Sequence, residues 1–122
     1  MQGLKNEDVP VWLGASDVLL LTSLHEGSPT IVKEALACNC PVVSVDVGDV
    51  RRRLNGIDGC YVAEADPGDL AAKLRLVRGR GRLVDARTRI AELSRECTAS
   101  EVAAFYRRVL DTARRPLHAV TA

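Results

Sequence analysis

The sequence predicts an α/β fold in which helices cover a small parallel sheet. Two short apolar runs, 18–21 and 42–45, have the length and composition of strands buried on both faces. Stretches with apolar residues at helical spacing follow them. Strands that alternate with helices form parallel sheets with right-handed crossovers. We expect about three parallel strands and five or six helices, in a single domain that covers residues 1–122.

Composition supports a folded domain and narrows the classes of function. The chain has 122 residues, nearly half of them hydrophobic, and a formal net charge of +1. No basic block is interleaved with aromatic residues, so we expect no nucleic-acid partner. No apolar segment approaches the ~20 residues that span a bilayer, and the first residues do not resemble a signal peptide. We therefore expect a cytoplasmic protein without a transmembrane segment.

The elements can be placed in order along the chain. A short helix is expected from Pro10 to Ala15, with Trp12 and Leu13 packing inward. Asn39 suits the left-handed position that ends a helix. The other expected elements are strands over 18–22, 42–45 and 60–62, and helices over 29–38, 50–54, 67–77, 82–95 and 99–114.

Capping signals mark three of these helix starts. Ser28 precedes Pro29, and Asp66 precedes Pro67, which is the order of a polar N-cap followed by a proline in the first turn. The last helix is expected to start at a capping box formed by Thr98 and Glu101. Pro116 ends it, and the tail through Ala122 is expected to fray.

The stretch 17–34 contains the candidate functional residues. It reads as a buried strand, a polar loop and a helix start, which is where α/β proteins bind anions with free N–H groups and the helix dipole. Pro29 has no N–H, so Thr30 and Ile31 are the expected donors. Ser28 is the expected N-cap.

Two carboxylates frame this helix start. Glu26 lies in the loop and Glu34 near the second turn of the helix. Both would repel a phosphate unless each accepted a hydrogen bond from a hydroxyl group, which a sugar supplies. The pattern therefore favours a sugar nucleotide, with its diphosphate at the helix terminus and its hydroxyls on the two glutamates.

The run from Glu26 to Glu34, followed by Pro41-Val42-Val43 and then Gly48, resembles the carboxyl-terminal part of the retaining glycosyltransferases of group 1, or family 4. The resemblance extends over about residues 9–110. It implies half of a doubly wound, Rossmann-like domain, namely the last three of about six strands. It also implies that the first half of this domain, and a separate acceptor-binding Rossmann domain, are not in this chain.

The resemblance also implies roles for single residues. Glu26 would act at the donor sugar as the catalytic residue, and Glu34 would hold the ribose hydroxyls. The substrate-binding set would be Gly27, Ser28, Thr30, Ile31 and Glu34. The donor would be a UDP- or GDP-sugar, used without a metal or other cofactor because the helix dipole and basic residues stabilise the leaving group.

Several nearby residues have a second interpretation. Arg51-Arg52-Arg53 could supply phosphate-binding charge, but we expect a solvated surface run whose loop lies too far from the site. Lys33 is expected on a solvated helix face, and His25 is expected to be exposed or to position its neighbours. The four cysteines have no common zinc spacing and are expected to be reduced thiols.

The incomplete sheet suggests a partner and leaves the function open. Strand 18–22 would have one unpaired, apolar edge, and such edges promote association. We expect a two-fold symmetric homodimer through this strand. Three functions are compatible with the sequence: a transferase part inactive as an isolated chain, a free-standing nucleotide- or sugar-phosphate-binding or assembly module, and a folded remnant without a ligand.

Overall fold

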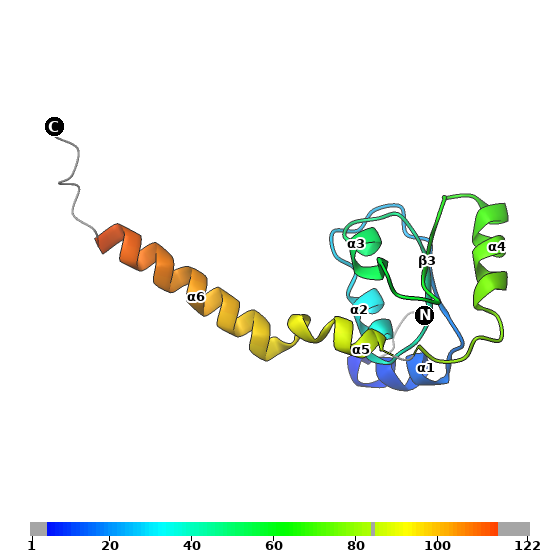
Figure 1. Cartoon of the computed structure of the whole chain (residues 1–122), viewed down its shortest axis with the longest axis horizontal. Helices are drawn as coiled ribbons and strands as arrows, with labels where there is room; N and C mark the ends of the chain where they lie inside the picture. Colours follow the sequence, from blue (N-terminus) through cyan, green and yellow to red (C-terminus); the bar gives the residue numbers. More distant parts are fainter. Residues whose placement is uncertain (1–4, 84, 115–122) are drawn as a thin grey trace. The chain divides into compact units, whose positions relative to one another are not determined.

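A computed structural model describes residues 5–83 and 85–114. The chain divides into two compact units, Met1–Ile90 and Ala91–Ala122, which are described separately (Figure 1). The first unit contains the sheet and most of the helices. That the whole chain forms one domain stays a prediction.

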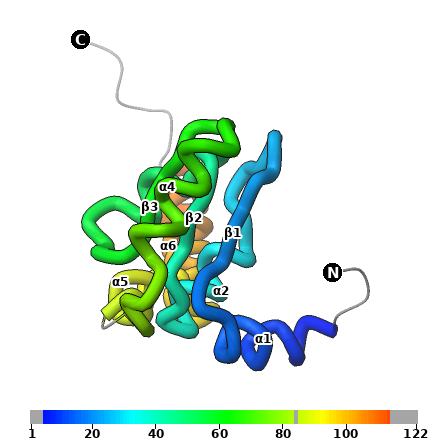
Figure 2. The backbone as a smooth tube through the Cα atoms, turned by 90° about the vertical axis from the view of Figure 1, so that its right-hand side faces the viewer, coloured from blue at the N-terminus to red at the C-terminus, as the bar shows by residue number. Residues whose placement is uncertain are grey.

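The sheet of the first unit has three parallel strands in the order β1-β2-β3. Strand β1 spans Leu19–Leu21, β2 spans Val42–Val45 and β3 spans Tyr61–Ala63. Figure 2 shows β2 between the other two strands. Together with the helices around it, this sheet confirms the predicted half of a doubly wound α/β fold.

One face of the sheet is covered by several helices. They are α1 (Val9–Ala15, preceded by the 3-10 turn η1, Asn6–Asp8), α2 (Thr30–Ala37), α3 (Val50–Leu54) and α5 (Ala86–Arg89). Their apolar side chains and those of the sheet form a continuous core. Its members include Leu13, Val32, Leu36, Val42, Val50, Leu54 and Leu83. Valine and leucine fill this core because the chain has few aromatic residues.

The other face is covered by α4 (Pro67–Val77), which packs on β2 and β3 and lies across the sheet from α2 and α3 (Figure 1). Its core is small and consists of Val43, Ala63 and Val77. The predicted cap is present, since the Asp66 carboxylate accepts a hydrogen bond from Asp69 N at 2.9 Å.

Asn39, at the end of α2, is hydrogen-bonded to the segment that follows α4. Its φ of 52° is left-handed, as predicted. Its backbone oxygen accepts a hydrogen bond from Leu83 N at 2.9 Å, and its side-chain oxygen accepts one from Arg87 N at 3.1 Å. The segment after α4 is thereby held against the core before α5 begins.

The helix predicted over 82–95 is wrong. The guanidinium of Arg82 donates hydrogen bonds to the backbone oxygens of Leu13 and Gly14 at the end of α1, and Leu83 bonds to Asn39. These contacts hold residues 82 and 83 outside any helix. Among the residues of this stretch that the structure describes, α5 and the 3-10 turn η2 (Ala91–Leu93) form, and α6 begins at Arg95.

The second unit consists of η2 and the long helix α6 (Arg95–Arg114). The predicted capping box at Thr98 is wrong because α6 begins earlier. Ser94 takes the capping role, with its hydroxyl accepting a hydrogen bond from Cys97 N at 3.2 Å, and Thr98 N bonds to Ser94 O inside the helix. Residues 115–122, where the chain was expected to fray, lie outside the described residues.

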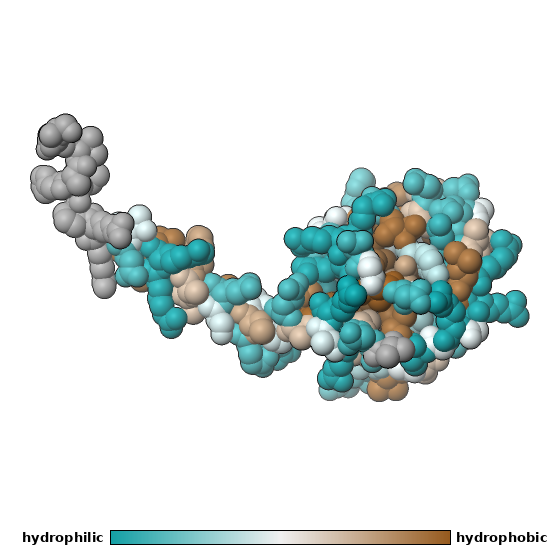
Figure 3. Space-filling view, viewed as in Figure 1, coloured by the Kyte–Doolittle hydropathy of each residue, from teal (hydrophilic) through white to brown (hydrophobic). Residues whose placement is uncertain are grey.

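Two further findings concern exposure. Leu13 is buried as predicted, but Trp12 is 53% exposed, so the expected inward packing of Trp12 is wrong. Hydrophobic residues over α1 reach the surface at the lower edge of Figure 3. Within the described chain, no helix has both the length and the apolar character that crossing a bilayer requires.

Candidate functional site

The candidate site lies at the carboxyl edge of the sheet, where β1 ends and a polar loop leads into α2. Helix α2 begins at Thr30, which is exposed, and Pro29 occupies the N-cap position without a side-chain hydrogen bond. The N–H groups of Thr30 and Ile31 therefore stand at the helix tip, as predicted. Ser28 as the N-cap is wrong: its hydroxyl donates to Asp49 Oδ2 at 2.8 Å instead. A carboxylate accepts a stronger, charge-assisted hydrogen bond than a neutral partner.

The loop after β1 touches the loop after β2 at a glycine. Gly48 has a φ of 54°, and a Cβ atom placed on it would lie 2.2 Å from Gly27 O and 2.8 Å from Glu26 O. Only a residue without a side chain fits this crossing. The backbone of Glu26 and Gly27 thus packs directly against Gly48. The Cβ position of Gly27 itself is open, with nothing within 4 Å.

Asp49 connects the two loops through its carboxylate. Besides the Ser28 hydroxyl, Oδ2 accepts hydrogen bonds from Arg53 Nε at 2.9 Å and from Arg52 at 3.3 Å. Burial disfavours the charged form of Asp49, but the hydrogen bonds from Ser28 and Arg53 outweigh it and lower the pKa of this carboxyl below its ordinary value. The carboxylate therefore stays ionised and holds the β1–α2 loop to the start of α3.

Positive charge is closer to the helix tip than the sequence suggested. Lys33 was expected on a solvated face, but its ammonium donates to Ser28 O at 3.2 Å, beside the start of α2. The expectation that the arginine loop lies too far away is also wrong, because Asp49 joins Arg52 and Arg53 to Ser28. The side chain of Arg53 is only 16% exposed, so we assign it a structural role. The side chain of Arg52 is 73% exposed.

The two glutamates occupy the expected elements. Glu26 is exposed in the loop, and Glu34 is half-buried on α2, one turn after Thr30. Within the described chain, neither carboxylate has a hydrogen bond or ion pair to another residue, so both remain open to a ligand. His25 was expected either to be exposed or to position its neighbours, and it is exposed.

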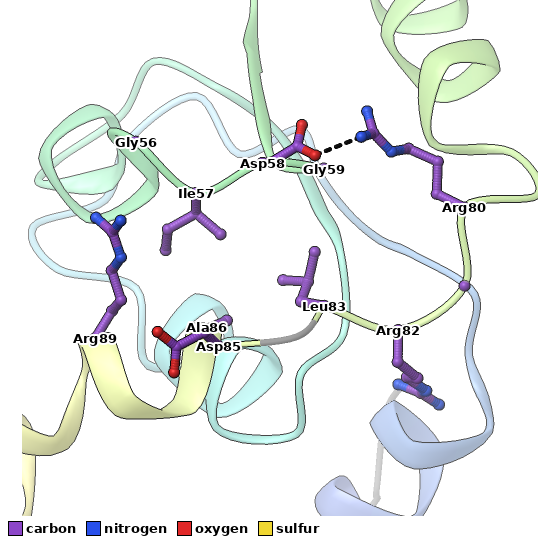
Figure 4. A pocket seen from close by; sticks show the side chains of 11 residues that line it. Gly56, Ile57, Asp58, Gly59, Arg80, Arg82, Leu83, Asp85, Ala86 and Arg89 are labelled. Atoms are coloured by element: carbon purple, nitrogen blue, oxygen red, sulfur yellow. Dashed lines mark hydrogen bonds and ion pairs between the residues drawn. The ribbon is translucent and has the colours of Figure 1, made fainter.

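A separate cavity of about 330 Å³ lies at the opposite, amino edge of the sheet, before β3. Figure 4 shows Ile57, Leu83 and Ala86 on its inner wall. At its mouth Arg80 pairs with Asp58, while the side chain of Arg82 turns toward α1. Because Glu26 and Glu34 follow the carboxyl end of β1, this cavity is not part of the candidate site.

Neither metal ligands nor disulfides organise the described part of the chain. It contains no group of three or more His, Cys, Asp or Glu side chains that could hold a metal ion. The four cysteines are free thiols: Cys40 and Cys60 are buried, Cys38 is half-buried and Cys97 is exposed.

The family described as "Glycosyl transferases group 1" matches residues 1–78, which is more than half of the chain. The chain belongs to this family. The predicted membership of the group 1 glycosyltransferases is thereby confirmed, and residues 26–49 of the site fall inside the matched region.

Two curated glycosyltransferases are similar to it. A D-inositol 3-phosphate glycosyltransferase of Geodermatophilus obscurus is 36% identical over 95 residues, which cover 75% of this chain and 21% of that protein. A putative teichuronic acid biosynthesis glycosyltransferase of Bacillus subtilis, TuaC, is 49% identical over 45 residues, or 37% of this chain and 12% of that protein. The chain thus spans about a fifth or less of these relatives. No solved structure matches it significantly.

Sequence reasoning missed the part of the candidate site that comes from the second loop. The sequence pointed to Gly48 only as part of the resemblance and assigned no role to Asp49. The available signal was the pair itself: a glycine followed by an acidic residue, directly after a buried strand parallel to β1. Parallel strands end at the same edge of a sheet, so their following loops meet.

Proposed function

We propose that this chain is the donor-side part of a sugar-nucleotide-dependent, retaining glycosyltransferase of family 4. The observation that carries the proposal is the exposed start of α2, with two open carboxylates in the family's spacing around it. Membership of the family and two curated relatives with glycosyltransferase names support it.

In this proposal the donor is a UDP- or GDP-sugar. Its diphosphate accepts hydrogen bonds from the N–H groups of Thr30 and Ile31, where the dipole of α2 adds positive character. Lys33 lies beside this position, 3.2 Å from Ser28 O, and adds charge. Glu34, on the next turn of the helix, accepts hydrogen bonds from the ribose hydroxyls.

Glu26 and its neighbours act at the sugar itself. Glu26 is the catalytic residue of the proposal, because an exposed carboxylate beside the diphosphate can stabilise positive charge that develops on the donor sugar. The open space at Gly27 lets the donor approach the backbone. Ser28 contributes by holding the loop, since its hydroxyl is bonded to Asp49.

We infer that the isolated chain binds a donor but does not transfer its sugar. The chain spans at most 21% of the relatives it matches, and a transferase also needs an acceptor site and the rest of the donor crevice. A cytoplasmic location belongs to the proposal, because the four thiols are free and reduced cysteines are typical of that compartment.

Calorimetric titration with UDP, GDP and their sugars tests the proposal directly. Binding is expected in wild type and lost or much weakened in Glu34→Ala, while Glu7→Ala, which removes an exposed carboxylate on η1, should bind as wild type does. Unchanged binding in Glu34→Ala would show that the ribose role is wrong.

The alternatives give other outcomes of the same experiment. Binding without hydrolysis or transfer, even after the missing parts of a relative are added in trans, indicates a binding module. No binding of any nucleotide or sugar phosphate indicates a remnant without a ligand.

We also propose that two copies associate through β1. Among the described strands, β1 pairs with β2 alone. Leu20 pairs in register with Val43 and points to the same face, yet Leu20 is 44% exposed and Val43 is fully buried. The open edge and the uncovered leucine are both apolar, which favours continuation of the sheet into a second copy.

Sedimentation equilibrium tests this contact. Leu20→Lys should weaken association, because a lysine on an edge strand opposes pairing. Leu76→Lys, at an exposed leucine on α4, is the matched control and should associate as wild type does. Equal association of wild type and Leu20→Lys would count against the β1 contact.

A further inference from the structure

Helix α6 carries an apolar stripe at its surface. The stripe consists of Val102, Phe105, Tyr106, Val109 and Leu110, each between 48% and 63% exposed. Their spacing of three and four residues places them on one face of a helix that is about 30 Å long. Figure 3 shows hydrophobic residues along α6 between hydrophilic ones. An exposed stripe of this length is typical of a surface that binds another helix.

The middle of the stripe is ordered by its aromatic rings. Phe105 and Tyr106 make an edge-to-face contact with ring centroids 6.1 Å apart, and the guanidinium carbon of Arg108 lies 5.9 Å from the centroid of Phe105. Side chains that are already fixed lose less entropy when a partner covers them. The stripe is therefore prepared for contact at its centre.

The charges beside the stripe differ between the two halves of the helix. The charged residues of the first half are Arg95, Glu96 and Glu101, and those of the second half are Arg107, Arg108, Asp111 and Arg114, so the formal charge is −1 in the first half and +2 in the second. Glu101 and Arg108 are seven residues apart, so they lie in one row along the edge of the stripe. A helix whose first half is net negative and whose second half is net positive is electrostatically complementary to itself when the second copy runs in the opposite direction.

We propose that α6 pairs with α6 of a second copy, antiparallel, about a two-fold axis near Phe105. The midpoint of Glu101 and Arg108 and the midpoint of Val102 and Val109 both fall within one residue of Phe105. One axis therefore brings each glutamate opposite the arginine of the partner and each valine opposite the other valine. A parallel pair would place the acidic halves together and the basic halves together, which costs energy.

This contact is independent of the proposed donor site and of the β1 contact. The β1 contact lies in the first unit and the α6 contact in the second, so each should hold two copies together when the other is removed. Val109→Glu should stop at the β1-linked dimer, Leu20→Lys should stop at the α6-linked dimer, and the double variant should be a monomer.

Matched variants separate pairing from helix stability. Ser100→Glu adds the same charge on the opposite face of α6 and should associate as wild type does, with equal helix content by circular dichroism for both variants. Val109→Glu in the Leu20→Lys background must lower the mass from dimer to monomer. If it leaves the mass unchanged, the α6 contact does not exist.

Charge reversal tests the direction of the pair. Glu101→Arg and Arg108→Glu should each weaken association in the Leu20→Lys background, and the two changes together should restore it, because each new arginine again faces a glutamate of the partner. A double variant no better than either single variant would overturn the antiparallel arrangement.

A distance measurement gives a second answer on direction. Cys97 is the exposed thiol of α6, and a spin label on it in a Cys38→Ser, Leu20→Lys background reports the label-to-label distance. With the axis near Phe105, the two Cys97 positions are separated by about 24 Å along the helices. A separation near 10 Å would instead indicate a parallel pair and would overturn the proposal.

Discussion

The two faces of the sheet differ in the size of the core that packs on them. On the face of α1, α2, α3 and α5, apolar side chains form one continuous core, and hydrogen bonds join neighbouring segments: Ser28 to Asp49, Arg82 to the end of α1, and Arg87 to Asn39. On the other face, α4 covers a core of three residues and leaves Leu20 of β1 44% exposed. The fold is therefore held mainly from one side, which is also the side that supports the candidate site.

Core truncation should show the largest difference between the faces. Leu36 is fully buried on α2 and Val77 is 3% exposed on α4. Leu36→Ala is expected to lower the free energy of unfolding by about 3 kcal/mol, and Val77→Ala by about 1.5 kcal/mol, because less apolar surface and a smaller cavity are involved. Urea unfolding followed by circular dichroism measures both. Equal losses would contradict the comparison.

Gly48 should be the next most sensitive position. Gly48→Ala forces a side chain into a left-handed backbone and against Gly27 O, and should cost about 2 kcal/mol or more of unfolding free energy. Gly14→Ala, with nothing within 4 Å of its Cβ and a helical backbone, should stabilise the chain by about 0.5–1 kcal/mol. Opposite signs for these two changes, measured by urea unfolding, would show that the crossing of the two loops needs a glycine.

The Asp49 link should have a smaller, pH-dependent effect. Asp49→Asn is expected to cost about 2 kcal/mol at pH 7, because it weakens hydrogen bonds to a charged carboxylate. The pKa of Asp49 is lowered from 3.8 in the folded chain, so this stability is fully present above pH 3.8 and is lost as the pH falls below that value. Unfolding curves from pH 7 to pH 2.5 should converge for wild type and variant.

Asp46→Asn provides the control for that experiment. Asp46 pairs with Arg51 on the surface, with side chains 47% and 65% exposed, and exposed pairs contribute about 0–1 kcal/mol. If Asp46→Asn lowered the free energy of unfolding as much as Asp49→Asn does, the link between the two loops would contribute no more to stability than an exposed ion pair.

Thiol reactivity should give the smallest and most local readout. Burial raises the pKa of Cys60 to about 11 and also raises that of Cys40, both on the better-covered face. Iodoacetamide at pH 8, followed by mass spectrometry of peptides, should modify Cys97 first and Cys40 and Cys60 last.

Since the pKa of Cys60 rises on folding, its contribution to stability is complete below pH 9 and is lost between pH 9 and about 11.

Much of the first unit could be predicted from the sequence. The strand Val42–Val45 and the helices Val50–Leu54 and Pro67–Val77 have the predicted bounds, because apolar runs and proline-marked helix starts are local signals. The resemblance to the family rested on the same kind of local motif.

The failures have a common physical cause, which is contact between distant segments. Arg82 and Leu83 fit a helical pattern, but hydrogen bonds to α1 and to Asn39 hold them outside a helix. Ser28 fits a helix cap, but its hydroxyl instead donates a hydrogen bond to a carboxylate 21 positions later in the chain. The positions of Lys33 and Arg52 relative to the helix tip also depend on tertiary packing. Local patterns contain no information about these partners.

The two hydrogen bonds to Asn39 bear on how this polypeptide can be shortened. The match to the family model ends at residue 78, and a truncation there would fall directly after α4. Such a piece would lack Leu83 and Ala86, which are 8% and 1% exposed in the intact core, and would leave both oxygen atoms of Asn39 to the solvent. For expression, labelling or complementation work, the shortest self-sufficient piece should therefore end at Ile90, where the first compact unit ends.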